Sequence, residues 1–242
     1  MNRRSKKLMI GILLVLLIGS LVFYAGVLFF DSANYHGELA TGDKNVLVCI
    51  VDEIEHRPGM GACDMAFILH LENGTFKNIS PVFPHGMTHP TKEEPYDAQA
   101  QGAGSQLLLH DAFWTSNNQQ SLDDAKEIVE YNENVSIDGV AAVNAEALTA
   151  ILREAGDISV GNETFTPDSF DIIGQQSYSG GNGRNASVMS IVRASIDKAK
   201  DPSIKSAMVQ AAFSQYSQGH IVITPKGGFT TLLYMKGLEN MN

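Results

Sequence analysis

Hydrophobic and polar positions divide the chain into one long apolar stretch and a series of shorter, patterned segments. Residues 8–30 contain no charged side chain. A helix rises ~1.5 Å per residue, so this stretch reaches across a hydrocarbon core of ~30 Å, and no other stretch approaches ~18 apolar residues. We therefore expect a single transmembrane anchor at residues 8–30. A cleaved signal peptide is the alternative, although its apolar core is usually shorter, and no Ala-x-Ala site follows here.

The charges on the two sides of this stretch predict its orientation. Residues 1–7 carry four of the 17 Lys and Arg residues, whereas all 27 acidic residues follow residue 30. The positive-inside rule then predicts a cytoplasmic basic tail at 1–7, the membrane anchor at 8–30, a linker at 31–44 and an extracytoplasmic domain at 45–242. We expect a single-pass protein of the cell membrane with its C-terminal domain outside the cytoplasm.

Beyond the linker, the patterns predict strands first. Residues 45–52 form a continuous β-branched and aliphatic run, which is typical of a strand buried on both faces. Residues 62–71 and 75–80 predict two further strands, joined at Asn73-Gly74, a strong hairpin signal. Little periodicity is visible in residues 81–106, so we expect a long surface loop there.

Helices are predicted in the second half of the chain. Apolar stripes at helical spacing follow residues with N-cap character, such as Ser121 and Asn144. The expected helices lie at 121–133, 144–156, 185–200 and 203–217, with short strands at 137–143 and 220–224. Strands alternating with helices indicate an α/β fold, a three-layer sandwich with a mixed central sheet whose antiparallel part comes from the hairpin.

Charge and cysteine content limit the partners and the scaffold. We expect no nucleic-acid partner, because non-specific affinity for nucleic acid needs basic clusters and the part after the anchor is strongly acidic. Only Cys49 and Cys63 are present, which allows at most one disulfide. Two buried thiols fit the sequence equally well.

Glycosylation is suggested by five Asn-x-Ser/Thr triplets. They begin at Asn73, Asn78, Asn134, Asn162 and Asn185. On an exported chain such triplets can accept glycans on exposed loops. In a glycosylating host we expect a glycoprotein modified on at least one of Asn73, Asn134 and Asn162, which fall in or beside predicted turns.

Candidate chemistry begins where the first predicted strand ends. Asp52 ends that strand, Arg57 follows in a polar turn, and Asp64 starts the next strand. Carboxylates at adjacent strand ends can converge where α/β folds bind ligands, and two of them with waters can hold Mg²⁺ against a phosphate. We expect Asp52, Arg57 and Asp64 to be catalytic, with Asp52 and Asp64 as metal ligands. The alternative is that Asp52 caps a turn and Asp64 is a solvated edge acid.

Two other segments supply candidate residues. The glycine-rich run SYSGGNGRN at 177–185 places Arg184 at the positive end of a predicted helix, where backbone N–H groups can meet an anion, so we add Arg184 to the catalytic set. A glycine loop without a ligand is the alternative. We expect the substrate to contact His85, His89, Asp111 and Trp114. The histidines could instead ligate a metal or be solvated loop residues.

Several motifs together carry a family resemblance. The run VLVCIVD, then R-x6-DMAFILHLENGTFKNIS and FPHG, resembles the opening of the LytR-CpsA-Psr domain. The runs HRPGMG, GSQLLLHDAFW, SIDGVAAVNAEALTAILREAGDISV and GRNASVMSIVRASI resemble more closely its relative, the domain of unknown function 4012 family, in a form met in methanogenic archaea. The similarity covers roughly residues 45–223.

The resemblance implies a membrane-anchored cell-envelope phosphotransferase that moves glycopolymers from polyprenyl pyrophosphate carriers, with acids that hold Mg²⁺ and arginines that grip the pyrophosphate. Asp52 matches the strand-end acid, Asp64 the metal acid, and Arg184 the arginine that opens the late helix. The chain departs from that family at 84–86, where Pro-His-Gly replaces Pro-Arg-Asp, and at 186–188, where Ala-Ser-Val replaces Arg-Gln-Gln.

Two hypotheses follow. The one we favour is an envelope protein with this fold that binds a polyprenyl-linked or wall glycan without catalysis, because His or Ser cannot replace bidentate guanidinium contacts. The alternative is an Mg²⁺-dependent phosphotransferase or pyrophosphatase that transfers glycopolymer from a polyprenyl pyrophosphate carrier.

Overall fold

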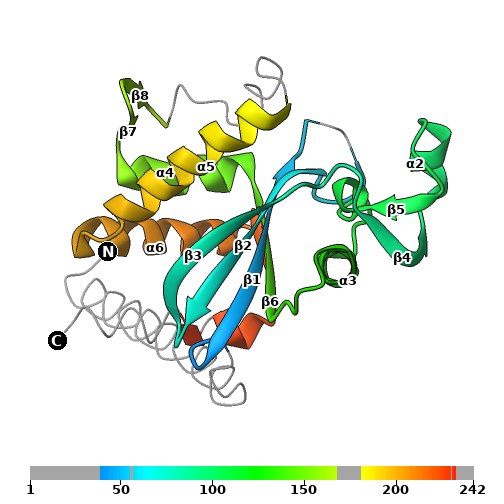
Figure 1. The fold of residues 1–242 in the computed structure, drawn as a ribbon, viewed down its shortest axis with the longest axis horizontal. Helices are drawn as coiled ribbons and strands as arrows, with labels where there is room; N and C mark the ends of the chain where they lie inside the picture. The colour runs from blue at the N-terminus through cyan, green and yellow to red at the C-terminus, as the bar shows by residue number, and fades with distance from the viewer. Residues whose placement is uncertain (1–38, 55–56, 168–180, 230, 233–242) are drawn as a thin grey trace, which may run out of the picture.

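A five-stranded mixed sheet forms the centre of the protein (Figure 1). The computed structural model describes residues 39–54, 57–167, 181–229 and 231–232. The strands follow the order β3-β2-β1-β6-β9, and only the β1–β6 pair is parallel. Their bounds are β1 (Asp43–Asp52), β2 (Ala62–Glu72), β3 (Thr75–Val82), β6 (Gly139–Asn144) and β9 (Ile221–Thr224). The predicted mixed sheet is confirmed.

The predicted hairpin joins β2 to β3. Asn73 and Gly74 both have positive φ angles, 50° and 68°, which a two-residue turn of the primed type requires and which Asn and Gly adopt most readily. The side chain of Asn73 also accepts a hydrogen bond from the backbone N–H of Gly42 at 2.9 Å. The turn is thereby tied to the start of β1.

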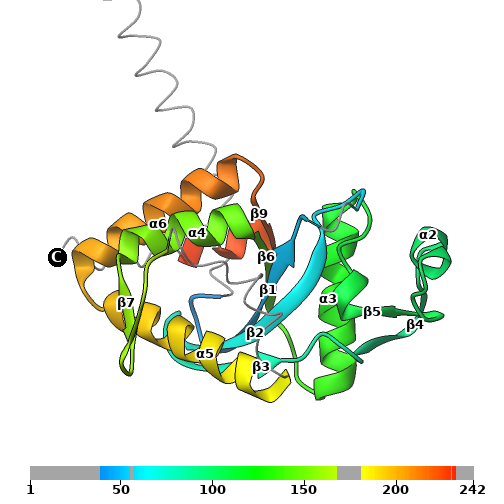
Figure 2. The same cartoon turned by 90° about the horizontal axis from the view of Figure 1, so that it is seen from above.

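Helices cover both faces of the sheet (Figures 1 and 2). Helix α3 (Asn118–Glu133) packs on one face, where Leu47 and Val140 of the sheet meet Leu122 and Ile128 of the helix in the largest hydrophobic cluster. The other face is covered by α4 (Ala145–Ala155), α5 (Gly181–Lys198) and α6 (Pro202–Ser217). The expected three-layer arrangement is therefore present.

Polar caps fix where two of these helices begin. The side chain of Asn144 accepts a hydrogen bond from the N–H of Ala147, as its position in the sequence predicts, so α4 starts directly after β6. Helix α3 begins earlier than predicted, because its cap is Asn117 rather than Ser121. Cys49 and Cys63 are both buried and free.

The prediction of a long loop at residues 81–106 was wrong. This region contains β4 (Thr88–Glu93) and α2 (Tyr96–Ala100), and β5 (Gln106–Leu108) follows and pairs with β4. These elements are short and partly exposed, and β4 includes Pro90, so the apolar periodicity that would mark them is weak. A second small hairpin, β7 (Ile158–Val160) with β8 (Glu163–Phe165), was also not predicted.

The expected membrane anchor lies outside the described residues. Within residues 39–54, 57–167, 181–229 and 231–232, no helix is long and apolar enough to cross a bilayer. Residues 8–30 thus stay a predicted anchor. Residues 177–180 of the glycine-rich run also lie outside this part of the chain, whereas Gly181 already belongs to α5.

Close backbone contacts hold the connection between β1 and β2. The N–H of Gly59 donates to the carbonyl of Trp114 at 2.8 Å. A Cβ atom at Gly59 would lie 2.2 Å from the carbonyl oxygen of Phe113 and 2.3 Å from that of Thr115. The connection therefore needs a residue without a side chain at this point.

We predict that Gly59→Ala lowers the free energy of unfolding by ~1–3 kcal/mol, the usual cost of forcing extra atoms into a packed site. Gly104→Ala is the matched control, because a Cβ at Gly104 meets nothing within 4 Å. Denaturant unfolding of the two variants checks this. Equal stabilities would show that the connection is not packed as described.

Candidate functional site

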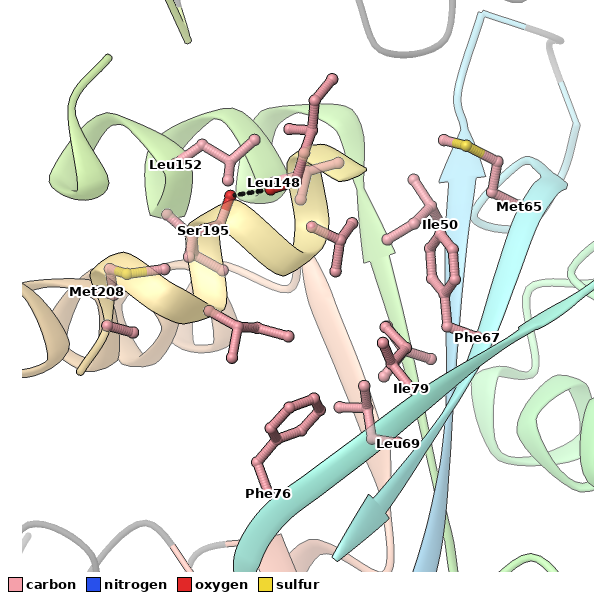
Figure 3. A pocket seen from close by; sticks show the side chains of 16 residues that line it. Ile50, Met65, Phe67, Leu69, Phe76, Ile79, Leu148, Leu152, Ser195 and Met208 are labelled. Atoms are coloured by element: carbon pink, nitrogen blue, oxygen red, sulfur yellow. Dashed lines mark hydrogen bonds between the residues drawn. The ribbon is translucent and has the colours of Figure 1, made fainter. Parts of the chain in front are cut away.

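An apolar cavity lies between the sheet and helices α4 to α6 (Figure 3). Its volume is about 310 Å³. Strands β1 to β3 form one wall with side chains such as Ile50, Phe67 and Ile79, and the helices form the opposite wall with Leu148 and Met208. The strand side chains point across toward the helices in Figure 3, so the cavity separates two layers of the fold.

The lining of this cavity offers almost no hydrogen-bonding group. Of the sixteen lining side chains, Ser195 is the one that carries a hydroxyl. This hydroxyl donates to the backbone carbonyl of Ile191 at 2.8 Å, one turn earlier in α5. A ligand in the cavity would consequently meet hydrocarbon on both walls.

A polar cavity of about 460 Å³ lies on the α3 side of the sheet. It is built where the β1–β2 connection meets the 3₁₀ helix η1 (Leu109–Asp111) and the turn after α2. Its lining includes Arg57, His110, Asp111 and Trp114. The two cavities therefore differ in both position and chemistry.

Arg57 is the centre of the polar cavity. One guanidinium nitrogen lies 2.5 Å from a carboxylate oxygen of Asp111, and both side chains are at least nine-tenths buried. The same nitrogen donates to the carbonyl of His110 at 3.1 Å, and the guanidinium carbon lies 4.8 Å from the ring centroid of Trp114, in cation–π geometry. Arg57 is thus held by charge, hydrogen bonding and stacking together.

His110 bridges two acids. Its Nδ1 lies 3.1 Å from Asp111 and its Nε2 lies 3.5 Å from Asp64. Hydrogen bonds to Asp111 and Asp64 raise the pKa of His110 to about 9, because both acids stabilise the imidazolium. The ring of His85 lies 5.1 Å from that of His110, centroid to centroid. At neutral pH the cavity accordingly contains two cations, Arg57 and His110.

A β-bulge directs Asp64 to this cluster. In the β1–β2 register Ile50 pairs with Met65 and Val51 with Cys63, so Asp64 is the extra residue of β2. Bulges re-aim side chains and are frequent beside functional sites. Here Met65 lines the apolar cavity while its neighbour Asp64 contacts His110. The bulge in β2 thus has one residue in the lining of the apolar cavity and its neighbour in contact with His110 of the polar cavity.

Two buried acids complete the polar cluster. Burial would raise the pKa of Asp111, but the hydrogen bond from His110 and the charge of Arg57 hold it below its ordinary value. Burial raises the pKa of Glu94 to about 7, with the neighbouring Asp111 adding to the effect and the backbone N–H of Leu108 opposing it. Glu94 is therefore a carboxyl group that is about half protonated near neutral pH.

The sequence-predicted residues fall into separate groups. The structure brings Arg57, Asp111 and Trp114 together, with Asp64 and His85 joined to them through His110. Asp52 is buried and accepts a hydrogen bond from the N–H of Ile54 at 2.8 Å, as a residue that shapes a turn does. Arg184 lies in the first turn of α5, and its side chain is outside the described residues.

His89 lies away from the polar cavity. It is almost fully buried, its Nδ1 accepts hydrogen bonds from the N–H groups of Thr91 and Lys92, and its Nε2 lies 2.9 Å from Glu127 of α3. These contacts connect β4 to α3. Both ring nitrogens are engaged in the fold, and neither is directed at the other predicted substrate-binding residues.

Sequence reasoning missed Glu94 and did not give His110 a role of its own. Glu94 stands in the charged run KEEP, which is typical of a solvated segment. No local pattern indicates that it is buried, because its burial depends on the β4–β5 pair and on η1. His110 precedes Asp111 directly, and that His-Asp pair was the one available signal.

A metal site is not formed by side chains alone in the described part of the chain. Among residues 39–54, 57–167, 181–229 and 231–232, no group of three or more His, Cys, Asp or Glu side chains could hold a metal ion. Mg²⁺ often binds through only one or two carboxylates together with waters and substrate phosphates. An ion at Asp64 would have to compete with the imidazolium of His110, 3.5 Å away.

Comparison with known proteins identifies the family. Residues 41–178 match the family described as protein of unknown function (DUF4012), and the chain belongs to it. The family resemblance drawn from the sequence is thereby confirmed, whereas the archaeal form stays a prediction. A search of curated proteins gave no match.

Several solved structures share the fold, among them the LytR-CpsA-Psr proteins TagV and TagT. Protein gbs0355 from Streptococcus agalactiae has a TM-score of 0.57 at 14% identity, covering 84% of this chain and 77% of its own. TagV from Bacillus subtilis has a TM-score of 0.51 at 13% identity, covering 81% and 80%. TagT bound to LIIa-WTA has a TM-score of 0.50 at 13% identity, covering 81% and 76%. At these identities the likeness concerns the fold.

We predict that Asp111→Ala lowers the free energy of unfolding by ~3–5 kcal/mol, because it leaves the buried guanidinium of Arg57 without its carboxylate. Glu72→Ala is the control, since Glu72 pairs with Lys77 at 2.6 Å on the surface and both side chains are half exposed. That exposed pair contributes less than ~1 kcal/mol. Chemical denaturation measures both. Similar losses in the two variants would contradict the buried ion pair.

Proposed function

We propose that this protein is a membrane-anchored, extracytoplasmic cell-envelope protein that binds a polyprenyl-linked glycan. The apolar cavity holds the isoprenoid tail, and the anchor at residues 8–30 keeps the domain beside the bilayer from which the lipid comes. The observation that carries this proposal is the chemistry of the cavity, whose sixteen lining side chains present one hydroxyl, already bonded within α5.

A hydrocarbon chain suits this cavity better than a peptide does. A bound peptide segment brings backbone N–H and C=O groups, and each of these costs free energy when it is buried without a partner. The cavity offers such groups no partner, whereas an isoprenoid chain needs none. At ~25 cal/mol per Å² of buried apolar area, contact along both walls supplies substantial affinity. Because a hydrocarbon chain brings no polar groups and a peptide does, we assign the ligand of this cavity to the lipids.

The polar part of the ligand would lie at the edge of the cavity where β1 and β2 carry acids. Asp52 follows Ile50 by two residues, and Ile50 lines the cavity. Helix α5 contributes cavity residues such as Ile191, and it begins at Gly181, so its positive end and Arg184 belong to the same element. A helix N-terminus with an arginine favours phosphate. The complex of TagT with LIIa-WTA, a protein with the same fold, is in keeping with this class of ligand.

The second candidate function is Mg²⁺-dependent phosphotransfer or pyrophosphate hydrolysis on the same lipid. It is favoured by Asp64, an acid that the bulge in β2 adds at the end of the β1–β2 pair, where an ion would have to displace the imidazolium of His110. In this reaction Asp52 and Asp64 would hold the ion, which supplies charge neutralisation at the phosphates. The absence of arginine at positions 85 and 186 weakens the case, since fewer guanidinium groups are available to the pyrophosphate.

A substitution at the open end of the apolar cavity tests the lipid-binding proposal. Phe76 lines the cavity and is 37% exposed, so Phe76→Ser removes a ligand contact without opening the core. We predict that it weakens binding of a polyprenyl monophosphate by roughly 5–30-fold, equivalent to ~1–2 kcal/mol of lost apolar contact. Binding to the purified full chain can be measured by native mass spectrometry.

Phe83→Ser is the matched control. Phe83 is 48% exposed and does not line the cavity. It should bind the lipid as the unmodified protein does. Equal affinity in the Phe76 and Phe83 variants, or a wild-type protein that binds inorganic pyrophosphate but not the polyprenyl chain, would overturn the assignment of the cavity to lipid.

A further inference from the structure

Glu94 is a buried acid that the proposed function leaves without a role. It lies between β4 and α2 and is only 3% exposed. Its N–H donates to the carbonyl of Ser105, its own carbonyl accepts from the side-chain amide of Gln99, and its Oε1 accepts from the N–H of Leu108 at 2.7 Å. Because both backbone and side chain are fixed, the carboxyl group cannot turn to solvent without breaking these bonds.

The second oxygen of this carboxyl group has no donor. Oε2 of Glu94 is buried, and no N–H or O–H group in the described part of the chain donates a hydrogen bond to it. The carboxyl group that adjoins Glu94 is that of Asp111. Two carboxylates only accept, so this contact becomes a hydrogen bond when one of them carries a proton. An unprotonated Glu94 would instead leave two anions side by side in a buried site.

The proton belongs on Glu94 rather than on Asp111. Asp111 faces Arg57 at 2.5 Å and His110 at 3.1 Å, and both cations favour its ionised form. Glu94 adjoins Asp111, and the charge of Arg57 has the smallest effect on its pKa. On its own segment, Lys92 is paired with Asp124, and Glu93 is exposed. The charges around the pair thus favour a protonated Glu94 beside an ionised Asp111.

We propose that Glu94 is a positioning residue, which shares one proton with Asp111 and thereby holds Asp111 against Arg57 in the polar cavity. This inference goes beyond lipid binding and does not depend on it. The side chains then form a connected row from Glu94 through Asp111 to Arg57 and Trp114. Loss of the proton places like charges together, and the repulsion pushes Asp111 and its partner Arg57 from their places.

The proton makes the polar cavity sensitive to pH near neutrality. With Glu94 neutral, the two cations Arg57 and His110 balance the two anions Asp64 and Asp111. Deprotonation adds one uncompensated negative charge. Since the pKa of Glu94 is raised from 4.5 to about 7, the stability that the proton contributes is complete below pH ~4.5 and is lost as pH rises through about 7.

Trp114 provides a direct readout, because it is the single tryptophan of the chain and it stacks on Arg57. We expect the fluorescence of the purified full chain to change between pH 6 and 8 with a midpoint near 7. Glu94→Gln should abolish this transition, because the amide keeps an acceptor for Leu108 and a permanent donor for Asp111. Glu94→Leu should likewise show no transition between pH 6 and 8, since no carboxyl group remains at position 94 to take up or lose the proton.

Glu127→Gln is the control variant. Glu127 contacts His89 away from the polar cavity, so this variant should keep the transition. A wild-type signal without a transition would overturn the proposal. A transition that persists in Glu94→Gln would also overturn it, by assigning the proton to another group such as His85.

A measurement on the wild-type protein covers the case in which the Glu94 variants do not fold. With ¹³C-labelled glutamate carboxyl groups, NMR should show one resonance that titrates near pH 7. Glutamate resonances that all titrate in the ordinary range of about 4–5 would overturn the shared proton.

Discussion

Strand β1 must be covered on both faces, and the rest of the structure depends on this constraint. It hydrogen-bonds to β2 along one edge and to β6 along the other, so its aliphatic residues point alternately into two layers. On the α3 side the space is filled by a continuous hydrophobic cluster. On the side of α4, α5 and α6 the helices stand off from the strands and leave a cavity of about 310 Å³. The proposed ligand site is thus the incompletely filled half of a two-sided core.

The β-bulge at the end of the β1–β2 pair connects this cavity with the polar chemistry. Regular alternation would direct side chains to the two faces in turn, but the extra residue Asp64 adds an acid at the point where the strands end. Met65 then contributes to the apolar wall, and Asp64 meets the imidazolium of His110. A buried guanidinium, an imidazolium and three acids lie together because each ion is paired, which is the condition under which charges remain buried. In our proposal, Glu94 and Asp111 share one proton beside these ions.

Local sequence patterns predicted the sheet and most helices. Residues 45–52 show the continuous apolar run of a strand that is buried on both faces, and Asn144 shows the N-cap residue at which a helix begins. The polar site could be predicted only in part. Arg57 and His110 are 53 residues apart, and their contact depends on how the β4–β5 pair carries η1 back to the sheet. Glu94 resembled a solvated residue because its neighbours are charged. The cavity could not be predicted, since an amphipathic pattern shows which side chains face inward but not whether they fill the space between layers.

The central claim is that the space between β1–β3 and α4–α6 holds the hydrocarbon part of a lipid. A crystal structure of the full chain grown with a polyprenyl phosphate tests it most directly. The account predicts continuous electron density for the isoprenoid chain between Phe67 and Leu148, with the phosphate at the end of the cavity near Ile50. Lipid density at another place on the protein, or a cavity closed by the protein's own side chains while lipid is present, would contradict the account.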